Sequence, residues 1–276
     1  MNNLVEFSLK KLKSNNILNP ELDLRILLNS SKIKNNEIFL STFNEKDINL
    51  EKFNKYLQRR LNNEPIAKII NKKYFWKNEF FVDNNVLDPR PETELIIEEC
   101  INLIHNNDEN ITILDIGTGS GCLSVSLAKE FVNSKILAID VSKKAIAVAK
   151  KNISKHNFSN QIKTEVLDYN KIKNNFDLIV SNPPYLSEIE YLIFKKNIKN
   201  FEPKIALYGG KDGLSFYRAF AKKLPNIMKV NSFLVLEIGE NQYFKCIELF
   251  NDSRLKLIKK STDLQKKDRI LVFRKV

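Results

Sequence analysis

The chain has 276 residues, enough for one large domain or for a core domain with a smaller one beside it. Its hydrophobic content of 43% is ordinary for a globular protein with a buried core, and no apolar run has the length of a membrane span. The net charge of +12 comes from lysines scattered as pairs, so it selects no particular partner. The N-terminal residues interleave charges with apolar side chains, unlike a signal peptide, and we expect a cytoplasmic protein.

Cysteine and histidine usage restricts the chemistry. Cys100, Cys122 and Cys246 are far apart and odd in number, which favours buried thiols over disulfides or a zinc site. His105 and His156 both lie in polar stretches where surface positions are expected. The sequence therefore argues against a histidine-based triad, and we expect no metal.

The first part of the chain, residues 1–64, has apolar residues at helical spacing and no glycine. Pro20 suits the first turn of one helix. These features predict a small helical bundle. Residues 65–88 are β-branched and aromatic, with polar Lys77, Asn78 and Glu79 between two apolar runs, which predicts an extended β-hairpin linker.

From residue 89 to 276, short apolar strands alternate with helices. This alternation predicts a doubly wound, mostly parallel α/β sheet covered on both faces. The last two strands are separated by a short polar loop, which predicts an antiparallel C-terminal hairpin. We expect helices at 92–104, 122–131, 143–153, 215–224 and 243–250, and strands at 111–116, 135–140, 162–167, 176–180, 233–238, 255–259 and 269–274.

A glycine-rich loop follows the first of these strands. Residues 115–121 read DIGTGSG and lead into a helix, at the position of the ligand crevice in a doubly wound sheet. Asp140 ends the next strand, where an acidic residue accepts hydrogen bonds from ribose hydroxyls. The glycine spacing differs from that of dinucleotide-binding loops, and a tight turn without a ligand is the alternative.

Three segments in this order, LDIGTGSG, AIDVS and SNPPY, resemble class I methyltransferases that use S-adenosyl-L-methionine. The resemblance implies a seven-stranded Rossmann-like sheet, with Asp140 on the ribose and Asp168 and Tyr169 beside the adenine. Alternatively, Tyr169 is a surface aromatic residue and Asp168 a helix cap. Tyr169 stands where relatives often have tryptophan. The cofactor-binding residues so implied are Gly117, Thr118, Gly119, Ser120, Gly121, Asp140, Tyr169 and Asn182.

The SNPPY segment closes the fourth strand with a stiff loop, because proline fixes its own backbone angle and restrains the preceding residue. A planar NH₂ group is a weak nucleophile that two preorganised acceptors can hold. The Asn182 side-chain oxygen and the Pro183 carbonyl could supply them, and Tyr185 offers a flat face. Asn182 as a simple cap is the alternative. With Pro184, these residues form the predicted catalytic and substrate-binding loop.

Further segments, RPETE, FEPKIALYGGKDGLSFYR and EIGENQ, resemble the peptide chain release factor N5-glutamine methyltransferases, as does the layout of bundle and hairpin. The family implies a target, the glutamine of a Gly-Gly-Gln motif in class I release factors, with S-adenosyl-L-homocysteine as by-product. It also implies that the bundle helps to dock this partner. Arg90, Glu92 and Glu94 would border the pocket, unless they only start a helix, and Glu202 and Pro203 would lie across the cleft.

Two other functions compete with this interpretation. An adenine-N6 or guanine-N2 methyltransferase would use the same loop, but the sequence contains no evident target-recognition insert. A non-catalytic scaffold that binds RNA or ribosomes would explain the basic charge, but not the retention of the glycine loop, Asp140 and Asn182. We expect a monomer that needs neither membrane nor nucleic acid.

Overall fold

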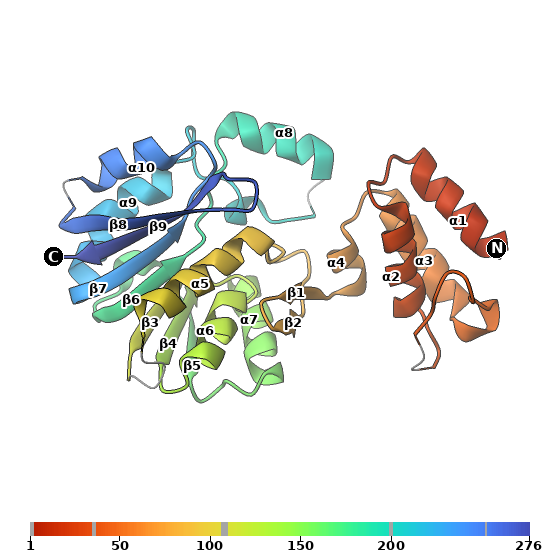
Figure 1. Ribbon diagram of the computed structural model, residues 1–276, viewed down its shortest axis with the longest axis horizontal. Coiled ribbons are helices and arrows are strands. Elements are labelled where there is room, and N and C mark those ends of the chain that lie inside the picture. Colours follow the sequence, from red (N-terminus) through yellow and green to blue (C-terminus); the bar gives the residue numbers. More distant parts are fainter. Residues whose placement is uncertain (1–2, 35–36, 106–109, 199–200, 252) are drawn as a thin grey trace. The chain divides into compact units, whose positions relative to one another are not determined.

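A computed structural model describes residues 3–34, 37–105, 110–198, 201–251 and 253–276. Figure 1 shows its helices and strands. The contacts divide the chain into two compact units. The first contains the described residues of 1–72 and 195–201, and the second those of 73–194 and 202–276.

The first unit is helical, as predicted. α1 (Asn3–Ser14), α2 (Pro20–Ser30) and α3 (Leu50–Leu61) bury apolar stripes in a common core. Arg60 on α3 reaches α2, where its Nε donates to Asp23 Oδ2 at 2.7 Å. The core therefore combines apolar packing with a cross-helix ion pair.

The structure corrects the interpretation of residues 66–70 as extended. They form a short helix, α4 (Ile66–Ile70), that begins after Pro65 and ends at a left-handed Asn71. Helical spacing packs Ile66, Ile69 and Ile70 against the core of the first unit, and this burial outweighs the β-propensity of isoleucine.

The predicted hairpin consists of β1 (Lys73–Phe75) and β2 (Asn78–Phe80), paired antiparallel. Its turn is Trp76-Lys77 and not the predicted Lys77–Glu79. Trp76 adopts a left-handed φ of 52°, and its backbone N–H donates to Glu94 Oε1 at 2.6 Å. Its indole N–H donates to Glu130 Oε1 at 2.7 Å, so tertiary partners fix this turn.

The second unit contains a sheet of seven described strands in the order β5-β4-β3-β6-β7-β9-β8. All neighbouring pairs are parallel except those that involve β9, which confirms the predicted sheet and its C-terminal hairpin. The strands are β3 (Thr112–Ile116), β4 (Lys135–Asp140), β5 (Ile162–Val166), β6 (Phe176–Ser181), β7 (Met228–Glu237), β8 (Leu255–Thr262) and β9 (Asp268–Lys275).

Helices cover both faces of the sheet (Figure 1), and each face has its own apolar core cluster. α5 (Glu94–Leu103), α6 (Cys122–Glu130) and α7 (Lys143–Lys155) contribute to one core cluster. α9 (Ser215–Lys223) and α10 (Tyr243–Phe250) contribute to the other. The strand order reverses between β3 and β6, so a ligand crevice is expected at their carboxyl ends.

α8 (Glu188–Ile198) has no counterpart among the predicted elements. Ile189, Leu192 and Ile193 of this helix are exposed. They do not form the buried apolar stripe from which an amphipathic helix is predicted in a sequence. β7 also begins at Met228, five residues before the predicted start, beyond a left-handed Asn231.

The cysteines and histidines lie mostly as expected. Cys100, Cys122 and Cys246 are buried free thiols, and burial raises the pKa of Cys122 and of Cys246 to about 12. His105 is exposed. His156, predicted at the surface, is half-buried: its ring lies 5.3 Å from that of Phe80, because α7 packs against the hairpin.

Candidate active site

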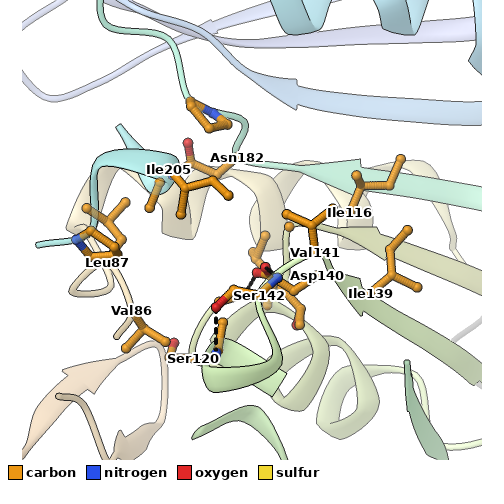
Figure 2. A pocket seen from close by; sticks show the side chains of 18 of the residues that line it. Val86, Leu87, Ile116, Ser120, Ile139, Asp140, Val141, Ser142, Asn182 and Ile205 are labelled. Carbon is orange, nitrogen blue, oxygen red and sulfur yellow. Dashed lines mark hydrogen bonds between the residues drawn. The ribbon is translucent and has the colours of Figure 1, made fainter. Parts of the chain in front are cut away.

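A cavity of about 350 Å³ opens at the carboxyl ends of the central parallel strands. Figure 2 shows Asn182 and Ile205 on one side of it and Ser120 and Ser142 on the other. The loop after β3, the end of β4 and the loop after β6 all contribute to its wall. Of the sequence-predicted site residues, the cavity is lined by Gly117, Thr118, Gly119, Ser120, Asp140, Tyr169, Asn182 and Pro184.

The remaining predicted residues are Gly121, Pro183 and Tyr185, which do not line this cavity. Gly121 has a φ of 79°, and a Cβ added there would lie 3.3 Å from Ala149 Cα. Its lack of a side chain therefore serves the close approach of α6 to α7. Pro183 is buried, and Tyr185 packs against the core cluster of α9 and α10.

The glycine loop is fixed by hydrogen bonds at both ends. The N–H groups of Gly117 and Thr118 donate to the Ile139 carbonyl, each at 2.9 Å. The hydroxyls of Thr118 and Ser124 donate to Asp115 Oδ2 at 2.7 and 2.6 Å. Gly117 is left-handed at 75°, so the loop presents backbone to the cavity in a conformation that other residues rarely adopt.

Asp115 is fully buried behind this loop. Burial raises the pKa of its carboxyl to about 6, although hydrogen bonds from Ser124 and Thr118 oppose the shift. Within the described residues its Oδ1 has no hydrogen-bond partner. Asp115 therefore supports the loop and does not line the cavity.

Asp140 lies at the end of β4, where the sequence predicts a ribose-binding acid. Its Oδ2 accepts from Gly119 N at 3.1 Å and its Oδ1 from Ser142 N at 2.8 Å. Burial is the main reason that the pKa of Asp140 is raised. A carboxylate has about four acceptor positions, so these two bonds fix its plane and leave room for a pair of hydroxyl groups.

Asp168 lines the cavity, and it also caps a short helix, as the alternative interpretation predicts, by accepting from Asn170 N at 2.8 Å. Tyr169 is half-buried and not a freely exposed aromatic residue. Its ring meets Phe220 edge to face at 5.0 Å. The cavity thus has an aromatic wall near the end of β5.

Asn182 belongs to a buried hydrogen-bond chain. Its Nδ2 donates to Thr93 Oγ1 at 2.9 Å, and Thr93 Oγ1 donates to Glu237 Oε2 at 2.6 Å. Thr93 and Glu237 are 3% and 1% exposed. The bond to Thr93 spans 89 residues of sequence, so Asn182 is anchored to the start of α5 and is not a simple cap.

Sequence reasoning missed the hydrogen bonds of Thr93 and Glu237 behind Asn182. Both lie inside segments that it singled out, RPETE and EIGENQ, but periodicity gives no information on which side chains meet across a sheet. It also missed the apolar wall of the cavity. That wall includes Val86, Leu87, Leu123, Ile205 and Phe216.

Comparisons with known proteins agree with this geometry. The family model of the methyltransferase small domain matches residues 92–201. The release factor glutamine methyltransferase of Buchnera aphidicola subsp. Baizongia pistaciae is 34% identical over 99% of this chain and 98% of its own. The chain belongs to the release factor glutamine methyltransferase family.

Other relatives of this chain are longer. A bifunctional methyltransferase of Rickettsia typhi is 38% identical over 91% of this chain but only 53% of its own length. The chain thus spans about half the length of the bifunctional relatives that it matches. A crystal structure of a methyltransferase from Pyrococcus furiosus covers 80% of the chain and 98% of its own, with a TM-score of 0.53 and 20% identity, which shows the shared fold.

Two of the segments that resemble this family in sequence contact the backbone of the loop that follows Asn182. Gln242 Nε2 donates to the Tyr185 carbonyl at 2.9 Å, and Gly209 N donates to the Leu186 carbonyl at 2.8 Å. A Cβ at Gly209 would lie 2.6 Å from the Pro184 carbonyl oxygen. One at Gly213 would lie 2.3 Å from the carbonyl oxygen of Tyr185, so both glycines are needed for close packing.

A second pair of family segments meets at the rim of the cavity. Arg90 Nη2 donates to Glu202 Oε2 at 2.6 Å, and Asp88 N donates to the other oxygen at 3.1 Å. Glu202 therefore ties the segment before α5 to the segment that contains Pro203, and both segments line the cavity. Glu92 and Glu94, which the family resemblance places at the pocket, are not lining residues, and Glu94 accepts from Trp76 N.

Among the described residues, no group of three His, Cys, Asp or Glu side chains is arranged to hold a metal ion. No helix in the described part of the chain is long and apolar enough to cross a membrane.

Proposed function

We propose that this chain transfers the methyl group of S-adenosyl-L-methionine to the N5 amide nitrogen of a glutamine side chain in a peptide chain release factor. Curated relatives named release factor glutamine methyltransferase match this chain along nearly its whole length. The products would be N5-methylglutamine and S-adenosyl-L-homocysteine.

The residues present fit the cofactor. The left-handed loop at Gly117 and Gly119 allows a ligand close to the backbone, and Asp140 keeps free acceptor positions for ribose hydroxyls. The volume of the cavity is in the usual range for small-ligand sites, and its apolar wall suits a purine. The bound cofactor would supply an electrophilic methyl group on a sulfonium.

The orientation of Asn182 is the observation that carries the proposal. Its NH₂ group is engaged by Thr93, so its Oδ1 is the atom left to accept a hydrogen bond from an amide NH₂. In the proposal the Pro183 carbonyl supplies the second acceptor. Two fixed acceptors orient the nitrogen lone pair toward the methyl carbon. On transfer, the electron pair of the broken sulfur–methyl bond would remain with S-adenosyl-L-homocysteine, and the nitrogen would lose one proton to water.

The finer features of the substrate are also part of the proposal. We place the target glutamine in a Gly-Gly-Gln motif, in which small neighbours would let the side chain reach a recessed loop. The helical bundle of the first unit is proposed to contact the rest of the release factor. Tyr185 and Pro184 would stiffen the binding loop, since Gln242 Nε2 donates to the Tyr185 carbonyl and Gly209 packs closely on the Pro184 carbonyl.

One labelling experiment tests the proposal. The protein is incubated with methyl-labelled S-adenosyl-L-methionine and either a class I release factor, the same factor with the motif Gln→Ala, or bulk RNA and DNA. We expect label on the intact release factor alone. Label on nucleic acid alone would replace the proposal with nucleobase methylation, and label nowhere would favour a non-catalytic scaffold.

A further inference from the structure

The hydrogen-bond chain behind Asn182 joins three separate parts of the second unit. Glu237 ends β7, Thr93 precedes α5, and Asn182 follows β6. Of these three hydrogen-bonded residues, Asn182 and Thr93 line the cavity, whereas Glu237 does not and is bonded to Thr93. A buried carboxylate is thus connected to the proposed substrate-binding amide through a single hydroxyl.

A threonine hydroxyl has one hydrogen to give. When Glu237 is ionised it can only accept, so the hydroxyl of Thr93 must donate to it at 2.6 Å. The lone pairs of Thr93 then face Asn182 and can be satisfied only by its NH₂ group, at 2.9 Å. The charge on Glu237 therefore decides which end of the Asn182 amide faces the cavity.

We propose that Glu237, acting through Thr93, is a positioning residue that holds the Asn182 amide with its oxygen toward the substrate. This inference rests on the proposed function, because it assigns the acceptor of the substrate NH₂. With the chain reversed, Asn182 would present its own NH₂ to the substrate NH₂, and two donors cannot pair.

Several groups face Glu237 and set its charge. Burial raises the pKa of its carboxyl to about 7, with Glu92 also raising it, while Thr93, Arg269 and Tyr185 lower it. The Tyr217 hydroxyl from α9 donates to the backbone carbonyl of Glu237 at 3.0 Å, so it does not compete with Thr93 for the carboxylate, to which Tyr185 also hydrogen-bonds. A protonated Glu237 can donate to Thr93, which then can donate to Asn182 Oδ1 and turn the amide.

Matched variants of Thr93 test the positioning role. Thr93→Val keeps the shape but removes the hydroxyl, and we expect kcat with a release factor to fall roughly tenfold or more. Thr93→Ser restores the hydroxyl and should remain within about threefold of wild type. The affinity for S-adenosyl-L-homocysteine, measured by calorimetry, should change little in either variant. Equal losses in the two variants would indicate packing alone and overturn the inference.

The pH profile provides an independent measurement. In the wild type, kcat should fall as pH drops through about 7, because protonation of Glu237 allows the chain to reverse. Glu237→Gln, whose amide can both donate and accept, should lower kcat and abolish this acidic limb. An acidic limb unchanged in Glu237→Gln would show that the carboxyl does not set the orientation.

The side-chain NH₂ resonances of Asn182 allow a test that needs no substrate. Asn182→Ala identifies them by their disappearance from a ¹⁵N–¹H spectrum. In wild type their exchange with water should be slow, and Thr93→Val should accelerate it whereas Thr93→Ser should not. Absence of any methylation by wild type would reject the proposed function, whereas equal exchange rates in wild type and Thr93→Val would reject the positioning role.

Discussion

At the scale of single residues, the site depends on which atom each polar side chain presents. Asp140 is held by two backbone N–H groups, so its remaining acceptor positions have a set direction. The NH₂ group of Asn182 is held by Thr93, so the side-chain oxygen of Asn182 also has a set direction. Gly119 and Thr93, one anchor of each side chain, lie 21 and 89 residues away in sequence, and the functional atom is the one that the anchors leave free.

Removal of the Asn182 side chain should separate turnover from cofactor binding. Asn182→Ala deletes the proposed acceptor of the substrate amide, so kcat should fall by roughly a hundredfold. The affinity for S-adenosyl-L-homocysteine should change little, because Asp140 and the glycine loop remain. Rates from a labelling assay and affinities from calorimetry check this. Asn226→Ala, which removes an exposed asparagine, is the control. Parallel loss of both quantities in Asn182→Ala would contradict the separation of roles.

The buried carboxyl of Glu237 should leave a mark on stability. Its pKa is raised from 4.5 to about 7, so the folded state holds the proton more tightly than the unfolded chain. Its contribution to the free energy of unfolding is therefore complete below pH 4.5 and is lost as pH rises through about 7. The free energy of unfolding of Glu237→Gln, relative to that of wild type, should therefore increase as the pH is raised from about 5 to about 8. Urea unfolding at both pH values measures it, and a constant difference would refute the linkage.

At the scale of elements, the loop after β6 is supported from behind by the segment around Gly209 and Gly213 and by Gln242. These contacts are mainly to backbone, so they fix where Pro184 and Tyr185 lie without using their side chains. The two prolines restrict the backbone conformation of the loop, and the supporting segment determines where the loop lies. Stiffness and placement thus come from different parts of the chain.

Two glycine variants should show the importance of this support. Gly213→Ala and Gly119→Ala both place alanine at a left-handed φ, 77° and 53°, which by itself costs about 1 kcal/mol. Only Gly213→Ala also brings a Cβ within 2.3 Å of the Tyr185 carbonyl oxygen, whereas the nearest atom at Gly119 is 3.8 Å away. We expect the midpoint of urea unfolding to fall clearly further for Gly213→Ala. Equal shifts would mean that the loop yields without cost.

At the scale of the whole molecule, the two units have separate cores. The first buries apolar residues among its own helices, and the second buries its sheet between two layers. Every residue that lines the cavity belongs to the second unit. Cofactor binding should therefore be a property of the second unit, while the proposed docking of a release factor involves the first.

Deletion of residues 1–72 tests this division. A fragment of residues 73–276 should fold, as judged by circular dichroism, because its core clusters lie within the second unit. It should bind S-adenosyl-L-homocysteine within roughly threefold of the full chain, since the lining residues are retained. Methylation of a release factor should fall much more. A fragment that methylates the factor at the full rate would show that the first unit is not needed for docking.

The sequence by itself was sufficient for the order and type of most elements and for the place of the glycine loop, Asp140 and Asn182. Strand–helix alternation and motif position are local patterns, and a parallel sheet brings the carboxyl ends of its strands to one edge. Prediction from the sequence failed where tertiary contacts outweigh local conformational preference. Ile66–Ile70 became helical to bury isoleucines, and the hairpin turn moved to Trp76 because Glu94 and Glu130 hold that residue.

Only the tertiary structure decided which atoms the site presents. Thr93 and Glu237 lie 89 and 55 residues from Asn182 in the chain, yet together they orient its amide. Gly121 and Tyr185, expected at the ligand, do not line the cavity: Gly121 allows α6 to approach α7, and Tyr185 packs against the core cluster of α9 and α10. A sequence reveals which polar groups are available near a strand end. The direction in which each one points depends on hydrogen bonds across the sheet, and these exist only once the chain has folded.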